Sequence, residues 1–157
     1  MTDPIITAAR DILDDSLKEL RVAVVGATPD ELNRRPAGQD TNSIAVLVVH
    51  SLTSTRMWLT AALGAPLPER DRDAEFVTVT ESEAALLAFQ DQMADECRAL
   101  LATDAPFDAA VERPTQHGSD FPETAQAGWA LLHALEHLRE HVAHTQLTRQ
   151  LLAARTA

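Results

Sequence analysis

The chain has 157 residues, of which 13 are Lys or Arg and 24 are Asp or Glu, so its formal net charge is −11. Hydrophobic residues make up 45% of the sequence, which suffices for a core and excludes a disordered or collagen-like chain. This length predicts one domain over residues 1–157. Because the acidic surface repels phosphate and only 4% of residues are aromatic, we expect no nucleic-acid partner.

The cysteine content and the N-terminal residues favour a cytoplasmic protein. The lone Cys97 excludes an internal disulfide and a cysteine metal cluster. The first ten residues lack the basic start and apolar run of a signal peptide. No stretch approaches the roughly 20 apolar residues that a membrane helix needs. We therefore expect a cytoplasmic protein without a membrane partner.

Two helices are predicted in the first half of the chain. The first covers residues 4–25, with Asp3 as its cap, and has apolar residues at three- and four-residue spacing. A polar segment over residues 30–40 follows. The second helix begins near Asn42, its expected cap, and ends at Leu63. Its early part is apolar on most sides, so we expect it to be buried.

Two further helices are predicted in the second half. Thr80 and Glu83 have the spacing of a capping box and open the third, whose inward face extends to Leu101. Before it, residues 66–79 are charged and predicted to be irregular, with a small hairpin at 76–79 as the alternative. The last helix covers residues 123–154. Four helices of this length predict an all-α fold, a four-helix bundle whose centre can hold ligands.

The last helix carries four histidines at spacings of four, four and three residues: His133, His137, His141 and His144. On a helical wheel His137 and His141 lean towards the apolar side, whereas the other two lie nearer the polar boundary. Two histidines four residues apart can bind one metal ion, because their side chains emerge one turn apart. HLREH lacks the glutamate of the HExxH motif, so a metalloprotease is disfavoured.

A third ligand is expected from the second helix, where His50 lies among apolar residues and needs a partner for its ring nitrogens. His117 falls in a predicted loop and is left outside the site. The alternative is that His50 is a hydrogen-bonded core residue and that His137 and His141 are a solvated pair. Trp58, Trp129, Met57 and Cys97 are interpreted as core or interface residues, and Cys97 is the weaker candidate for a nucleophile.

Two segments resemble the DinB/YfiT-like superfamily, which includes thiol-dependent S-transferases and the metal-binding domain of mycothiol-dependent maleylpyruvate isomerase. The first runs from Asn42-Ser43-Ile44 to His50 and is similar to the second helix of that family. The second, HLREH at residues 137–141, is similar to its terminal HxxxH helix. The resemblance implies an up-down-down-up bundle and a metal site formed by His50, His137 and His141. It also implies zinc or nickel as the cofactor and a homodimer, for which Trp129, Leu147 and Leu151 are candidate surface residues.

Two functions fit these residues. Three neutral imidazoles leave a coordination position open, which is typical of catalytic zinc sites. The leading hypothesis is therefore a metal-dependent enzyme, a thiol S-transferase or hydrolase, that activates a low-molecular-weight thiol or water for transfer to an electrophilic small molecule. The alternative is a non-catalytic, metal-stabilised binding or stress-response protein.

Overall fold

The structure, a computed structural model, describes residues 3–103, 107–114 and 123–154. Four long helices dominate it: α1 (Pro4–Val24), α3 (Ile44–Ala62), α5 (Glu83–Leu100) and α6 (Ala127–Ala154). The remaining elements are short: α2 (Pro29–Asn33), a 3₁₀ turn η1 (Gly38–Asp40), α4 (Arg72–Glu75) and the strands β1 (Ala110–Glu112) and β2 (Thr124–Gln126).

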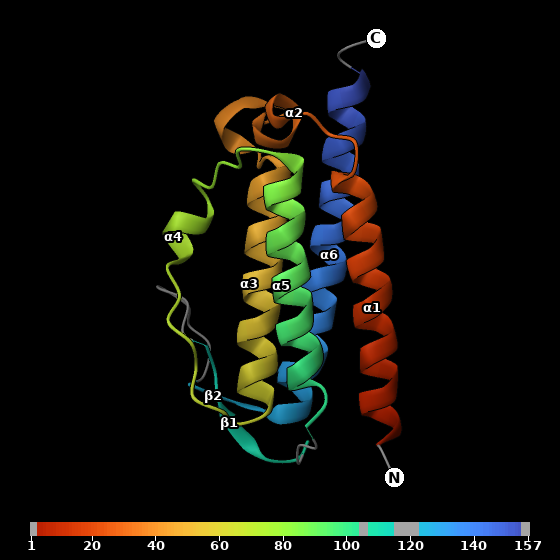
Figure 1. The fold of residues 1–157 in the computed structure, drawn as a ribbon. Coiled ribbons are helices and arrows are strands. Elements are labelled where there is room, and N and C mark those ends of the chain that lie inside the picture. Colours follow the sequence, from red (N-terminus) through yellow and green to blue (C-terminus); the bar gives the residue numbers. More distant parts are fainter. Residues whose placement is uncertain (1–2, 104–106, 115–122, 155–157) are drawn as a thin grey trace.

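The long helices form the predicted all-α four-helix bundle. Helix α3 packs against α5 and α6, and α1 packs against the same two helices from the other side. In Figure 1, α1 and α6 run upward whereas α3 and α5 run downward, so the topology is up-down-down-up. Because α3 and α5 point the same way, the chain between them returns along the length of the bundle through α4 (Figure 1).

The helix starts differ in detail from the prediction. Asp3 accepts a hydrogen bond from the Ile5 amide and caps α1, as expected. Ser43, rather than Asn42, caps α3 through the Val46 amide. Such one-residue shifts arise because neighbouring polar residues offer equivalent capping oxygens.

The predicted capping box at Thr80 and Glu83 is wrong. Ser82 caps α5 by accepting a hydrogen bond from the Ala85 amide. The Thr80 hydroxyl instead donates to the Ser82 carbonyl, and the Glu83 carboxylate accepts from the Gly26 amide of another segment. Tertiary hydrogen bonds thus replace the reciprocal pair that the spacing suggested.

The connections hold more structure than the sequence indicated. The polar segment after α1 contains α2, whose capping box is formed by Thr28 and Glu31. Residues 76–79 form no strand, and the one strand pair among the described residues joins β1 and β2 in antiparallel register, with Val111 opposite Ala125. Residues 124–126, expected in the last helix, therefore belong to β2, and α6 starts at Ala127.

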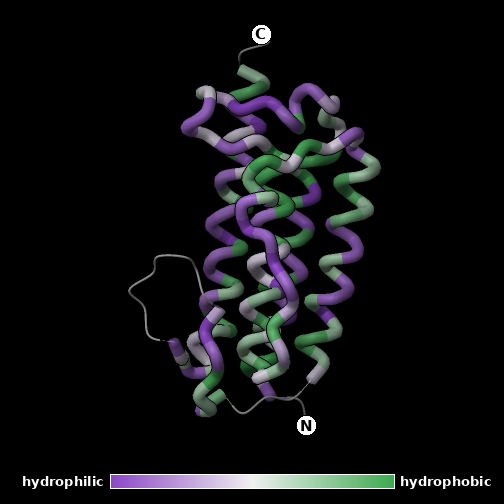
Figure 2. Tube along the Cα trace, turned by 90° about the vertical axis from the view of Figure 1, so that its left-hand side faces the viewer, coloured by the Kyte–Doolittle hydropathy of each residue, from purple (hydrophilic) through white to green (hydrophobic). Residues whose placement is uncertain are grey.

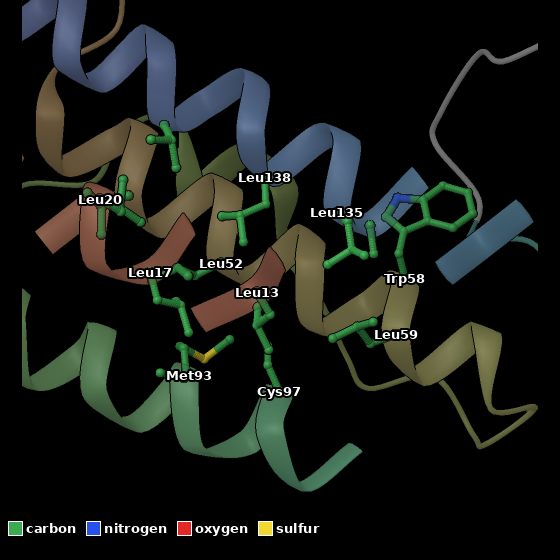
Figure 3. Close-up of a cluster of buried hydrophobic side chains, with 14 of the residues drawn as sticks. Leu13, Leu17, Leu20, Leu52, Trp58, Leu59, Met93, Cys97, Leu135 and Leu138 are labelled. Atoms are coloured by element: carbon green, nitrogen blue, oxygen red, sulfur yellow. The ribbon is translucent and has the colours of Figure 1, made fainter. Parts of the chain in front are cut away.

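Leucines from all four long helices fill the core. Figure 3 shows Leu13 and Leu17 of α1, Leu52 and Leu59 of α3, Met93 and Cys97 of α5, and Leu135 and Leu138 of α6 directed towards a common centre. Figure 2 shows the corresponding mixture of hydrophobic and hydrophilic residues along these helices. Helix α3 is buried on nearly every side, as its sequence predicted.

One stretch within the described parts of the chain, Gly38–Ala62, is long and apolar enough to cross a membrane by length and composition. The sequence analysis did not anticipate this. Of its most apolar window, 83% is buried inside the bundle. Contact with the other helices therefore accounts for the hydrophobicity of this stretch.

Replacing Leu13 by Ala should lower the free energy of unfolding by about 2–5 kcal/mol, because it leaves a cavity in a fully buried site. Urea unfolding followed by circular dichroism measures the change. Val22→Ala is the matched control on the same helix, since Val22 is 73% exposed. Equal stability of the two variants would contradict the placement of the core.

Candidate metal centre

The bundle brings together the three histidines that the sequence singled out. His50 projects from α3, whereas His137 and His141 lie one turn apart on α6. Each offers one ring nitrogen, and these three atoms all lie within 4.8 Å of one another. Because α3 packs directly on α6, residues 87 or more positions apart in the chain share one site. The predicted convergence of His50 with the α6 pair is a feature of the structure.

The spacing of the α6 pair fits a metal ion. The Nε2 atoms of His137 and His141 are 3.2 Å apart. Two nitrogens bound to one tetrahedral zinc at about 2.0–2.1 Å lie about 3.3 Å from each other. The Nδ1 atoms of both rings are buried and have no hydrogen-bond partner among the described residues. The spacing of this pair therefore matches that of two ligands on one zinc ion, and the set of three imidazole nitrogens has the composition that such an ion accepts.

Electrostatics keeps the α6 pair in the form that binds metal. Burial, together with the neighbouring imidazoles of His141 and His50, lowers the pKa of His137 to about 3. Burial and the neighbouring His50 and His144 lower the pKa of His141 to about 4. Both rings are therefore neutral at pH 7, and neutral imidazole is the ligand form.

His50 is held by a hydrogen bond to a carboxylate that the sequence did not indicate. Its Nδ1 lies 2.8 Å from Oε2 of Glu75, at the end of α4. Arg70 donates to the same carboxylate through Nε, 2.6 Å from Oε1, and through Nη2, 2.8 Å from Oε2. The side chains of His50, Glu75 and Arg70 are only 7%, 6% and 10% exposed. We call these three residues the Arg70–Glu75–His50 triad.

The charges in the Arg70–Glu75–His50 triad compensate one another. Burial raises the pKa of Glu75, but hydrogen bonds from Arg70 and His50 outweigh this effect, so the pKa of the carboxyl lies below its ordinary value. Glu75 is therefore ionised at neutral pH, and the Arg70 guanidinium balances its charge. On another side of His50, the Phe76 ring lies with its centroid 4.7 Å from the imidazole.

The other histidines of α6 stand outside the cluster. The His133 ring stacks on Trp129, with centroids 4.7 Å apart, and meets the edge of the buried Trp58. His144 is exposed, with its ring centroid 5.5 Å from that of His141. Neither joins the group of ligand atoms. His117 lies outside the described residues.

Cys97 does not have the environment of a nucleophile. It is fully buried in the core, and burial raises the pKa of its thiol to about 12. The reactive form of cysteine is the thiolate, which is negligible at neutral pH with such a pKa. Its interpretation as a buried apolar residue is confirmed.

The fold and the site define the class of this protein as a four-helix bundle with an inward trio of histidines, on its second and last long helices, that could hold a metal ion. The chain belongs to the DinB superfamily, whose sequence profile matches residues 12–145. A solved structure of a conserved protein from Enterococcus faecalis has a similar fold, with a TM-score of 0.75, 14% identity, and coverage of 97% of this chain and 99% of that chain. No curated protein matches the sequence.

Glu75 and Arg70 gave little signal in the sequence. They lie in a charged connection, ERDRDAEF, in which four acidic residues at every second position alternate with two basic residues and one alanine, without the spacing of a helical face. Nothing in their spacing relates them to His50, which precedes Glu75 by 25 residues. A buried histidine does require a partner for its second nitrogen, and that requirement was the one available hint.

The metal-free protein should lose stability as the pH falls from about 6.5 towards about 4, since an unfolded histidine ionises near 6.5. In the folded protein the pKa values of His137 and His141 lie at about 3 and about 4. The unfolded chain therefore binds protons that the folded chain rejects, so acidification favours unfolding.

Urea unfolding in the presence of a chelator, over a pH series, measures this dependence. The double variant His137→Gln/His141→Gln should show a shallower loss of stability with falling pH than the wild type. Leu132→Gln is the matched control, because Leu132 is 63% exposed on the same helix and does not titrate. An unchanged pH dependence in the double variant would contradict the burial of these rings.

Proposed function

We propose that the protein is a metal-dependent enzyme that activates a low-molecular-weight thiol, or water, for transfer to an electrophilic small molecule. His50, His137 and His141 are the proposed ligands of zinc or nickel. The observation that carries the proposal is the ligand number: among the described residues, the cluster contains three nitrogen donors and no fourth ligand. Three protein ligands with an open position are typical of catalytic zinc sites, whereas structural sites are closed by four.

The ligand charges support an anionic nucleophile. Three neutral imidazoles would leave the double positive charge of an ion uncompensated, and Arg70 balances the one carboxylate that contacts a proposed ligand within the described residues. A divalent ion bound by these residues would lower the pKa of a thiol or water that reaches it. The protein contributes the position of the three nitrogens and the burial of His50, which is 5% exposed and so shielded from bulk water.

The proposed transfer is a nucleophilic displacement. The thiol loses its proton to solvent, its sulfur forms a bond to the electrophilic carbon, and the leaving group departs with the electrons of the broken bond. No general base is assigned. Glu136 and Glu140 are exposed on α6, and the Glu75 carboxylate is already engaged by Arg70 and His50.

Purified untagged protein should contain about one divalent ion per chain, and the metal-loaded form should turn over in panels of thiols and electrophiles. His50→Ala should lose metal and turnover, because two nitrogens on one helix make an incomplete site. His144→Ala, an exposed neighbour on α6, is the matched control and should retain both. Stoichiometric metal without turnover above His50→Ala would reject catalysis and favour the metal-stabilised binding protein.

A homodimer is proposed as the solution state. Leu147 and Leu151 lie one turn apart on α6 and are 52% and 46% exposed, which is unfavourable for large apolar side chains in water. The double variant Leu147→Glu/Leu151→Glu should shift the mass measured by sedimentation from dimer to monomer. Val77→Glu, at an exposed position in the α4–α5 connection, should not. A monomeric wild type would reject the homodimer.

A further inference from the structure

We propose that Glu75, held in place by Arg70, is the positioning residue of the metal centre: it fixes the His50 proton on Nδ1 and so leaves the Nε2 lone pair for the ion. This inference rests on the proposed metal site and deepens it. It assigns a role to the connection between α3 and α5, which supplies both Glu75 and Arg70.

The Glu75 carboxylate is ionised and decides which ring nitrogen of His50 carries the proton. Arg70 donates two hydrogen bonds to Glu75, one to each oxygen, and such bidentate pairing requires the ionised carboxylate. An ionised carboxylate can only accept hydrogen bonds. The 2.8 Å contact between His50 Nδ1 and Oε2 of Glu75 therefore makes Nδ1 the donor. A neutral imidazole that donates through Nδ1 carries its lone pair on Nε2.

The same contact orients the His50 ring. With Nδ1 directed at Glu75, the ring centroid lies 5.3 Å from that of His137 and 5.0 Å from that of His141. The opposite tautomer would place a hydrogen on Nε2 and remove the third donor from the cluster. Hydrogen bonds of this type, from a ligating histidine to a carboxylate, fix the tautomer and raise the basicity of the ligand in metal sites.

Glu75 in turn is anchored by Arg70. Glu75 is the last residue of α4, a four-residue helix in a long connection, so few neighbouring backbone elements fix its side chain. Arg70 supplies that support from five residues earlier, and its Nη2 approaches His50 Nδ1 to 3.5 Å without displacing the carboxylate. Removing Arg70 would take two hydrogen bonds and the balancing charge from a buried carboxylate, so the position of Glu75 at the ring would be less fixed.

The tautomer of His50 can be measured directly in the wild-type protein. ¹⁵N NMR of the imidazole nitrogens, in metal-free full-length protein at neutral pH, should show a proton on Nδ1 and none on Nε2. A spectrum with the proton on Nε2, or with both nitrogens protonated, would overturn the proposal. This measurement needs no substitution, so it does not depend on whether a variant folds.

Zinc affinity, measured by competition with a fluorescent chelator, tests the consequence. Glu75→Gln should bind zinc about 10–100-fold more weakly than the wild type, as is usual when the partner of a ligating histidine is lost. Arg70→Gln should show a smaller loss in the same direction. Glu96→Gln is the matched control, because Glu96 also pairs with an arginine, Arg56, at 2.7 Å, but has no hydrogen bond to a histidine in the part of the chain that the structure describes.

The outcomes separate this inference from the proposed function. Wild-type affinity in Glu75→Gln would overturn the positioning role and leave the metal-dependent enzyme intact. Weakened zinc binding in Glu75→Gln, in a protein that shows no turnover with any thiol, would support the positioning role and reject the enzyme. A wild type that binds no zinc or nickel would overturn both. For each variant, the melting temperature with zinc is compared with that of the same variant without metal. A general loss of stability then cannot be mistaken for a loss of zinc binding.

Discussion

The burial of helix α3 on nearly all sides is the constraint on which the rest of the structure depends. A helix in this position exposes few polar groups to water, so a polar group on it that lacks a partner within the protein is unfavourable. Its hydroxyl side chains do so locally: Thr55 and Thr60 donate to carbonyls one turn earlier in the same helix. His50 cannot satisfy two ring nitrogens in this way, and its partners therefore come from other elements.

Those partners lie on two sides of α3 and come from different parts of the chain. Glu75 reaches one ring nitrogen from the connection that follows α3, and the α6 pair approaches from the adjacent helix. A carboxylate on one side and two neutral imidazoles on the other make the environment asymmetric. This asymmetry fixes the orientation of the His50 ring. The contacts that bury His50 also orient its nitrogens, so the packing of the bundle and the chemistry proposed for the site depend on the same residues.

The sequence predicted the parts of this arrangement that depend on periodic patterns. The spacing of His137 and His141 relates directly to a helical face, and the apolar surroundings of His50 indicate burial, so the fold and the meeting of the three rings could be predicted. The resemblance to a known superfamily supplied the pairing of the two segments. Whether the three rings bind metal stays a prediction.

The Arg70–Glu75–His50 triad could not be predicted, because no periodic pattern relates a connection to the helix it crosses. The capping box at Thr80 failed for a related reason. Tertiary hydrogen bonds to distant residues decided where α5 begins. Strand β2 was missed because three residues give too short a pattern to distinguish from the first turn of α6.

The parallel arrangement of α3 and α5 has a consequence for how this fold tolerates change. A helix of 19 residues is about 28 Å long, and an extended chain covers that distance in about nine residues. The chain between Leu63 and Ser82 is about twice as long as the return journey requires. The surplus lets the segment bring the Glu75 side chain to His50 of α3. Deletions after Phe76 would therefore shorten a connection that is longer than the distance requires. Deletions between Arg70 and Glu75 would instead change the spacing of the two residues that hold His50.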